Sequence, residues 1–150
     1  MAYQGPSRLG LVVERVFASG DRAMKPLQLP LRVLLHLEIP NRHFANGLRL
    51  VHPYNVIIHA DAELGQRVTI YHNVTIATVL SGPRQGAPVV GDDVTIFPNS
   101  VIMGDIHVGN GATIGAGSIV IHSVPAGGVV AGNPARLVDG QQLRENEDTE

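Results

Sequence analysis

The sequence contains no cysteine and no tryptophan, and only 4% of its residues are aromatic although 44% are hydrophobic. The absence of cysteine excludes a disulfide framework, a thiolate metal site and a cysteine nucleophile together. The shortage of aromatic side chains means that the core is built from Val, Ile, Leu and Ala, a composition that suits thin and regular layers. The 150 residues fit a single domain, because ~100–200 residues is the usual size of one.

An excess of charge of one sign is also lacking. The chain has 11 Lys and Arg against 13 Asp and Glu, a formal net charge of −2. This balance predicts no electrostatic footprint for nucleic acid or for an anionic membrane surface. No apolar run approaches ~18 residues, and the N-terminus lacks the pattern of a secretory signal. We therefore expect a cytoplasmic protein that neither inserts into membranes nor binds nucleic acid.

The sequence does contain an aliphatic residue at every sixth position, with one interruption, between residues 58 and 120. These residues are Ile58, Leu64, Ile70, Ile76, Val90, Ile96, Ile102, Val108, Ile114 and Val120. A helical stripe would drift out of phase with this spacing, and a simple amphipathic strand would show period two. A fixed short repeat predicts a solenoid, in which each unit buries a face against the next.

The series is broken in two places. Ile76 and Val90 are fourteen positions apart where twelve would keep the phase, which indicates an insertion of two residues. Segment 77–89 is rich in Gly, Pro and Ser and predicts a loop that protrudes from the solenoid. The second break lies at the start of the series, where the position six residues before Ile58 holds His52. This imidazole is either a solvent-facing residue in a distorted coil or a functional group at the edge of the first coil.

Two apolar segments precede the repeat. Residues 9–17 have the i, i+3, i+4 spacing of an amphipathic helix, and residues 29–37 predict a short, buried helix that starts at Pro30. Between residues 38 and 52 no periodicity is established. The predicted organisation is a helical cap (1–37), a β-solenoid domain (38–138) and a disordered acidic tail (139–150).

Local motifs in the repeat resemble those of the hexapeptide-repeat acyltransferases. They are GLRLVHPYNVIIHADAELG (47–65), VTIYHNVTIA (68–77), GAP…GDDV (86–94), IGAGSIV (114–120) and VPAGGVVAGNPARLV (124–138). Together they are similar to the serine acetyltransferase-like branch. The resemblance implies an all-β solenoid, the left-handed parallel β-helix, with three hexapeptides per triangular coil. It also implies acetyl-CoA as acyl donor, no metal, and a homotrimer with each active site between neighbouring solenoids.

The same resemblance assigns catalytic residues. His52 matches the general base of the family, and Glu38 is the best match to the acid that orients it. An imidazole with a pKa near ~6.5 can take the proton of a hydroxyl as that hydroxyl attacks a thioester. A carboxylate on the other ring nitrogen fixes the tautomer and stabilises the imidazolium.

Four further residues match positions that contact CoA in the family. Ala77 and Thr78 would line the thioester end, and Ala116 would leave room for the pantetheine arm. Arg136 is the candidate for the 3′-phosphate, an interaction suited to a guanidinium. Arg136 is equally well interpreted as a solvated charge where the chain leaves the solenoid.

The acceptor is where the chain departs from the serine enzymes. They carry Asp directly before the catalytic His, where this chain has Val51, and an Arg-His pair at the positions of Gly86 and Ala87. Recognition of an amino acid needs opposite charges placed nearby. The segment His-Pro-Tyr is more similar to the branch that acetylates sugars and other small-molecule hydroxyls, with Tyr54 and Arg84 as acceptor contacts. We therefore expect a small-molecule or sugar acceptor, with serine as the alternative.

Two features of the ends favour the same expectation. Only residues 1–37 precede the Glu38 segment, too few for the long N-terminal helical domain of the serine enzymes. The chain ends in Glu150, whereas those enzymes end in an aliphatic residue that docks on their partner synthase.

Two other classes of function remain. A non-catalytic scaffold would need the repeat but not the IGAGS and GNPAR motifs. A zinc hydratase of similar fold would need clustered histidines, but the closest pairs, His36/His43 and His52/His59, are seven positions apart and face differently in a period of six. A metal site is therefore not expected.

Overall fold

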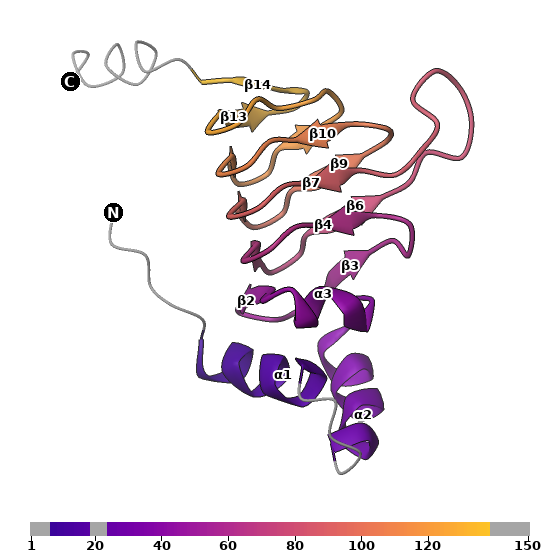
Figure 1. The fold of residues 1–150 in the computed structure, drawn as a ribbon, viewed down its shortest axis with the longest axis vertical. Helices are drawn as coiled ribbons and strands as arrows, with labels where there is room; N and C mark the ends of the chain where they lie inside the picture. Colours follow the sequence, from indigo (N-terminus) through magenta and orange to yellow (C-terminus); the bar gives the residue numbers. More distant parts are fainter. Residues whose placement is uncertain (1–6, 19–23, 139–150) are drawn as a thin grey trace, which may run out of the picture.

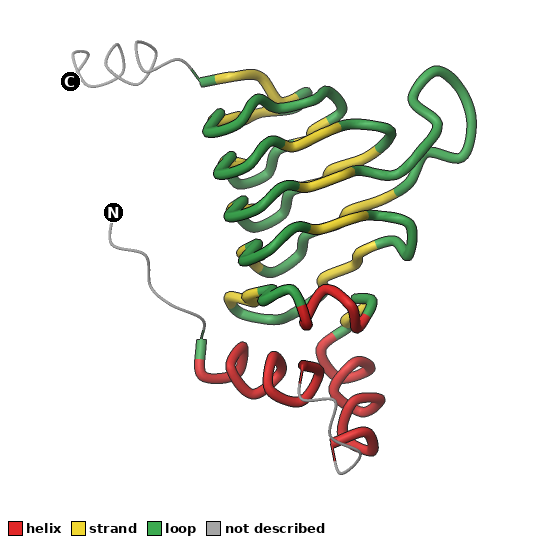
Figure 2. The backbone as a smooth tube through the Cα atoms, viewed as in Figure 1, coloured by secondary structure: helices red, strands yellow, loops and turns green. Residues whose placement is uncertain are grey.

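The computed structural model describes residues 7–18 and 24–138, so the predicted acidic tail lies outside the described residues. Helices gather at one end and a stack of coils forms the rest (Figures 1 and 2). The helices are α1 (Arg8–Ala18), α2 (Lys25–Leu35) and α3 (Asn41–Ala45). The strands are β1 (Leu37–Glu38), β2 (Arg49–Val51), β3 (Val56–Ile58), β4 (Glu63–Leu64), β5 (Thr69–Tyr71), β6 (Thr75–Ala77), β7 (Val89–Val90), β8 (Thr95–Ile96), β9 (Val101–Met103), β10 (His107–Val108), β11 (Thr113–Ile114), β12 (Ile119–Val120), β13 (Val129–Gly132) and β14 (Ala135–Leu137).

The strands form three sheets that the chain visits in rotation. Sheet A has the order β1-β3-β6-β9-β12, sheet C the order β4-β7-β10, and sheet B the order β2-β5-β8-β11-β13, with β14 antiparallel at its end. All other pairings are parallel, and in the regular coils they join residues 18 positions apart, such as Val101 and Ile119. Eighteen residues are three hexapeptides, so one coil contributes one strand to each sheet. The parallel coils that the period of six predicts are thus observed.

The core lies inside the coils and is aliphatic. All ten residues of the hexapeptide series are buried, and each contributes about 1.5–3 kcal/mol by leaving water. Two serines also point inward, and the hydroxyls of Ser100 and Ser118 both donate to the carbonyl of Gly115, at 3.0 and 2.6 Å. These buried polar groups are therefore satisfied within the stack.

The interruption of the series is larger than the spacing predicts. Ile76 in β6 pairs with Ile102 in β9, 26 positions later, which exceeds a regular coil by eight residues. Because β6 and β7 are successive strands, Ile76 and Val90 are a single hexapeptide step apart. The prediction of a two-residue insertion is therefore wrong. Fourteen positions can be two hexapeptide steps with two extra residues or one step with eight extra residues. The period of six fits both, so the sequence pattern does not distinguish them.

The start of the series also differs from the expected phase. Leu50 in β2 fills the inward position and pairs with Ile70, twenty positions later. The first full coil thus has two residues more than a regular one. The extra residues lie in the turn from His52 to Asn55, both of which have positive φ. His52 is therefore an exposed turn residue in a coil with two extra residues, and Leu50 fills the inward position that the count of six assigns to residue 52.

The second helix begins and ends elsewhere than predicted. Helix α2 starts at Lys25, with Pro26 in its first turn and Pro30 in its interior, and it ends at Leu35. His36 adopts a left-handed conformation after it, and Leu37 already belongs to strand β1. The apolar run 29–37 misled the prediction because an inward strand residue and a buried helix residue are both apolar. Segment 38–52, which shows no period, forms α3 and β2.

Helix α1 covers the first coil, as the predicted role of the cap requires. The Glu14 carboxylate accepts a hydrogen bond of 2.8 Å from the N–H of Leu50 in β2, a strand at the open edge of sheet B. An edge strand left bare would expose its backbone to other chains. Burial raises the pKa of Glu14, and this effect exceeds the lowering by the Leu50 N–H and Arg49.

One buried residue of the cap is polar. His43 in α3 is only 2% exposed, and neither ring nitrogen has a hydrogen-bond partner within the described ranges. Burial, with a smaller contribution from the nearby charge of Arg42, lowers the pKa of His43 to about 4. The imidazole is therefore neutral in the folded protein at neutral pH.

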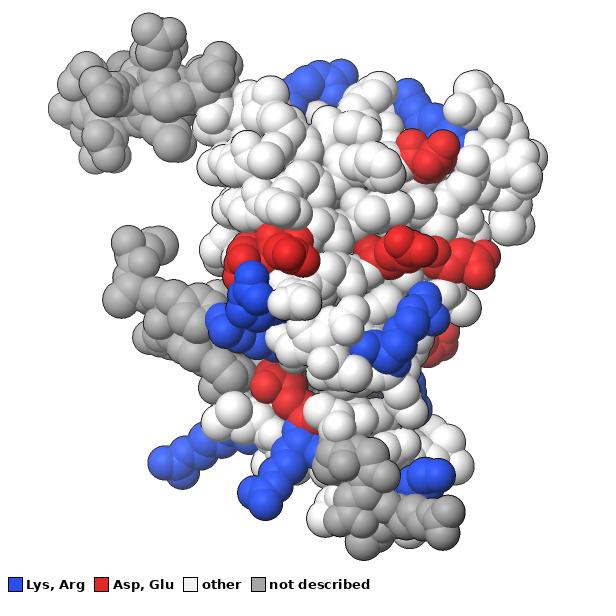
Figure 3. Space-filling view, viewed as in Figure 1, with Lys and Arg blue, Asp and Glu red and all other residues white. Residues whose placement is uncertain are grey.

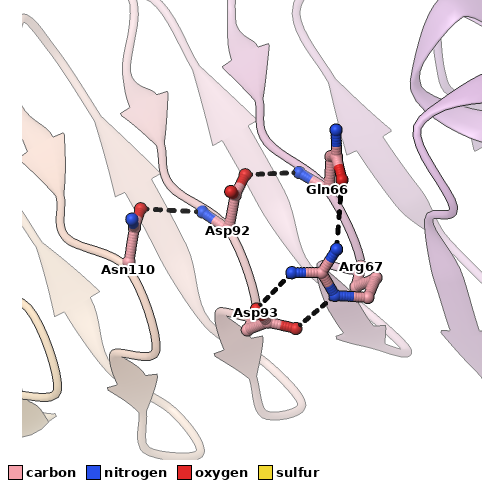
Figure 4. A network of polar contacts seen from close by, with 5 residues as sticks. All are labelled: Gln66, Arg67, Asp92, Asp93 and Asn110. Atoms are coloured by element: carbon pink, nitrogen blue, oxygen red, sulfur yellow. Dashed lines mark hydrogen bonds and ion pairs between the residues drawn. The ribbon is translucent and has the colours of Figure 1, made fainter.

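Polar side chains link the turns between sheets C and B (Figure 4). The N–H of Gln66 donates to Asp92 at 2.7 Å, and the N–H of Asp92 donates to Asn110 at 3.0 Å. Arg67 forms two hydrogen bonds with the carboxylate of Asp93, at 2.7 and 2.6 Å. Asp92 and Asn110 thus satisfy backbone donors of the preceding coil, while Asp93 takes the left-handed turn conformation, which Asp tolerates.

Candidate active site

The turns between sheets B and A form a corner, here called the B–A corner, which carries His52. Each coil places one residue at the same position on this corner, in the order Tyr54, His72, Pro98 and Ala116. Their carbonyls hold the next turn: those of Tyr54 and His72 accept hydrogen bonds of 2.9 and 3.3 Å from the N–H groups of Asn73 and Asn99. The amides of Asn55, Asn73 and Asn99 are also hydrogen-bonded in series. The backbone at this corner is therefore fixed by the coils on either side.

His52 is exposed and lies in a small cleft at the start of this corner. Its N–H donates to the hydroxyl of Ser7 at 3.4 Å, and its ring centroid is 6.3 Å from that of His72. The cleft has a volume of about 280 Å³ and is lined by Ser7, Leu9, Leu35, His52, Pro53, Tyr54 and His72. Sequence reasoning missed His72, although it lies twenty positions after His52, the offset that relates Leu50 to Ile70.

Glu38 lies elsewhere in the same chain. It is exposed at the end of β1 and lines a wide groove of about 1110 Å³ along sheet A, together with His36, His59 and Ala77. His59 accepts a hydrogen bond from the N–H of Asp61 at 3.2 Å. His52 and Glu38 thus line different hollows, and one chain alone does not pair them.

The turns between sheets A and C form the A–C corner, and the eight-residue insertion leaves the stack there (Figure 1). Val79 and Gly86 exchange two backbone hydrogen bonds of 2.9 and 3.0 Å, and the hydroxyl of Thr78 donates to the carbonyl of Gly86 at 2.8 Å. The carbonyl of Arg84 accepts a hydrogen bond of 3.1 Å from the N–H of Asp105, so the loop is fastened to the next coil. The exposed Arg84 side chain lines a hollow of about 520 Å³ at this corner.

The remaining candidates follow the same division. Ala116 is exposed on the B–A corner, whereas Ala77 and Thr78 lie on the A–C corner. Arg136 lies in β14 at the far end of the stack and lines a hollow of about 350 Å³ with His122. Apart from Arg136, which lies in sheet B, the predicted residues are therefore divided between the two edges of sheet A.

Part of the chain matches a family of known proteins. Residues 87–122 match the family described as bacterial transferase hexapeptide, six repeats. Within residues 7–18 and 24–138, no three His, Asp or Glu side chains gather in a group that could hold a metal ion.

The individual proteins that the chain resembles have more specific activities than this family description. Serine acetyltransferase 4 of Arabidopsis thaliana is 36% identical over 99 residues, which are 66% of this chain and 28% of that protein. The 2,3,4,5-tetrahydropyridine-2,6-dicarboxylate N-acetyltransferase of Staphylococcus aureus is 40% identical over 85 residues, 57% of this chain and 35% of that protein. A serine acetyltransferase solved in complex with CoA has a TM-score of 0.65 and 28% identity, covering 86% of this chain and 57% of its own.

The comparisons thus support the hexapeptide-repeat transferase family, with serine acetyltransferases among the homologues and structural neighbours. The expected closer similarity to the polysaccharide branch is not supported, because the named relatives are serine and tetrahydropyridine dicarboxylate acetyltransferases. The chain spans about a third or less of the length of these two curated relatives.

Proposed function

We propose that this chain is an acetyl-CoA-dependent acetyltransferase with the fold of a left-handed parallel β-helix, working as a homotrimer. The relatives support acetyl transfer, and the neighbour solved with CoA supports the donor. Serine is the acceptor favoured by the relatives and is the first to test. The observation that carries the proposal is the division of the candidate residues between the two edges of sheet A, with His52 and Glu38 in different hollows, which favours a site completed by a second chain.

In the proposed reaction His52 is the general base. Its imidazole takes the proton of the acceptor hydroxyl as the oxygen attacks the thioester carbonyl, and the C–S bond then breaks. The proton returns to the sulfur, so that CoA leaves as a thiol. Glu38 of the neighbouring chain orients the imidazole and stabilises its protonated form. His52 is exposed, as this role requires.

The donor is held by small side chains and one cation. Ala77 and Thr78 take the thioester end, where the loop leaves the coil. Ala116 is exposed, and a Cβ added to the adjacent Gly117 would meet nothing within 4 Å, so this corner leaves room for an extended pantetheine arm. Arg136 takes the 3′-phosphate through its exposed guanidinium.

A second candidate is a different hydroxyl acceptor, with Tyr54 and Arg84 as its contacts. The observation that favours it is Val51, which is only 4% exposed and stands where the serine enzymes that this chain resembles carry Asp. An apolar, buried residue there cannot bind the ammonium group of an amino acid. An acceptor panel that includes serine separates the two candidates.

The test is release of free CoA from acetyl-CoA in the presence of serine and of other hydroxyl compounds. His52→Ala should lower kcat by about 10²–10⁴-fold if it is the general base. His107→Ala removes an exposed imidazole on sheet C and serves as the control. Full turnover by His52→Ala would refute the assignment.

A mixing experiment tests the shared site. His52→Ala and Glu38→Gln chains should each be inactive as pure trimers. When the two are coexpressed, some interfaces combine an intact His52 with an intact Glu38, so part of the activity should return. No recovery in purified mixed trimers would show that both residues act within one chain.

A further inference from the structure

The outer surface of the cap is apolar. Seven of the eleven large hydrophobic residues that are exposed in the described part of the chain lie on α1 and α2. They are Leu9, Leu11, Val12, Leu27, Leu29, Val33 and Leu34. Scattered exposed leucines need no explanation, but a contiguous apolar patch marks an interaction site.

Helix α2 contributes most of this surface. One face of this helix, at the i, i+3, i+4, i+7 spacing, consists of Pro26, Leu29, Pro30 and Val33. All four residues are exposed. Leu29 and Val33 are 69% and 68% exposed, and the neighbouring Leu34 is 71% exposed. Leu35 is the one buried residue of this helix. The outer face of α2 therefore has no partner among the described residues.

The same end of the molecule is basic. The two helices carry four cations and one carboxylate, and that carboxylate, Glu14, accepts the Leu50 N–H. Arg8, Arg15 and Lys25 are exposed. In Figure 3 blue side chains extend from this end, whereas most of the red ones lie over the coils. Residues 37–138 carry five Lys and Arg and six Asp and Glu, so the coils are close to neutral, and residues 139–150 hold most of the acidic excess. The net charge of −2 of the whole chain therefore conceals the local excess of positive charge on α1 and α2.

We propose that α1 and α2 dock the protein on an anionic lipid surface. The apolar face of α2 enters the boundary between headgroups and acyl chains, and the exposed cations meet lipid phosphates, as in interfacial amphipathic helices. None of the described helices is long and apolar enough to cross a membrane, so the association is peripheral.

A second copy of this chain is the competing occupant of the face. Pairing two such faces would bring two basic surfaces together, and like charges across an interface are costly. The charge of the cap therefore favours an anionic surface. This inference does not depend on the proposed acetyl transfer, although Leu9 also lines the His52 cleft and Val33 also lines the groove that holds Glu38.

The test is sedimentation of the full chain with vesicles made of equal parts phosphatidylglycerol and phosphatidylcholine. Removing apolar contacts in Leu29→Gln/Val33→Gln should reduce partitioning by at least about tenfold. Each of Arg15→Gln and Lys25→Gln should reduce it by about fivefold. Leu80→Gln, which changes an 82% exposed leucine in the A–C loop, is the matched control and should leave partitioning unchanged. Because the substituted side chains are exposed, all variants should fold.

Three results would overturn the proposal. The first is absence of wild-type binding to the anionic vesicles. The second is equal binding to pure phosphatidylcholine, since the cations would then have no role. The third is a smaller oligomer for Leu29→Gln/Val33→Gln in sedimentation equilibrium without vesicles, which would assign the face to a second copy.

Discussion

Replacing His43 by leucine should remove a pH-dependent loss of stability. The imidazole is buried without a hydrogen-bond partner among the described residues, and burial lowers its pKa to about 4. In the unfolded chain the same group has a pKa of about 6.5. Between these two values the unfolded state binds more protons than the folded state. Stability that is present above pH ~6.5 is therefore lost as the pH falls toward ~4.

The size of the effect follows from the two pKa values. At pH 5 the difference in proton binding destabilises the folded protein by about 2 kcal/mol, and at pH 7.5 the difference is close to zero. In a domain of this size about 2 kcal/mol lowers the melting temperature by roughly 4–8 °C. His43→Leu should lack this part of the acid sensitivity. It should also be at least as stable as the wild type at pH 7.5, because a buried polar group without a partner is costly.

The assay is urea unfolding of both proteins at pH 7.5 and pH 5, with His107→Leu as a variant that removes an exposed imidazole. The wild type and His107→Leu should lose about 2 kcal/mol more than His43→Leu between the two pH values. Equal losses in all three proteins would refute the reasoning. They would mean that the His43 ring reaches water or a hydrogen-bond partner in solution.

Two further predictions concern the coils. Deleting residues 79–86 brings Ile76 and Val90 to a spacing of six, so the shortened chain should fold with a melting temperature within several degrees of the parent while losing acceptor turnover; failure to fold would show that the loop is part of the stack. Gly109→Ala should lower the free energy of unfolding by about 2–3 kcal/mol in urea. The added Cβ would lie 2.7 Å from the backbone Cα of Ala126 in the next coil. Gly117→Ala, at a φ of +69° with open space around it, should cost about 1 kcal/mol, and an equal loss for both would contradict the assigned packing.

The coils could be predicted because each hexapeptide repeats the same physical requirement. An inward aliphatic residue such as Ile96 or Ile114 is needed at every step, and Asp93 and Gly111 stand where the turns take a positive φ. The number of residues in the insertion could not be predicted, since the pattern repeats every six positions and carries no count of coils. The register of 26 between Ile76 and Ile102 supplies that count.

The candidate site could be predicted only as a set of residues, and not as an arrangement. His52 was identified by its motif, but its neighbour His72 comes from the next coil and depends on the two extra residues at the first turn. Glu38 and His52 are separated because Glu38 ends a strand of sheet A, whereas His52 follows a strand of sheet B. Both facts concern the order in which the chain visits the three sheets, and no local pattern encodes that order.

The regular stack also makes distance a stepwise property. Neighbouring strands are about 4.8 Å apart, so from β6 to β12, two coils along sheet A, the span is about 10 Å. The distance between two contacts on a molecule that lies along sheet A is therefore a whole number of coils. Insertion or loss of one 18-residue coil would change this distance by about 5 Å and leave the residues at both ends unchanged. Such a protein can be fitted to a longer or shorter ligand by repetition alone, without a new side chain at either end.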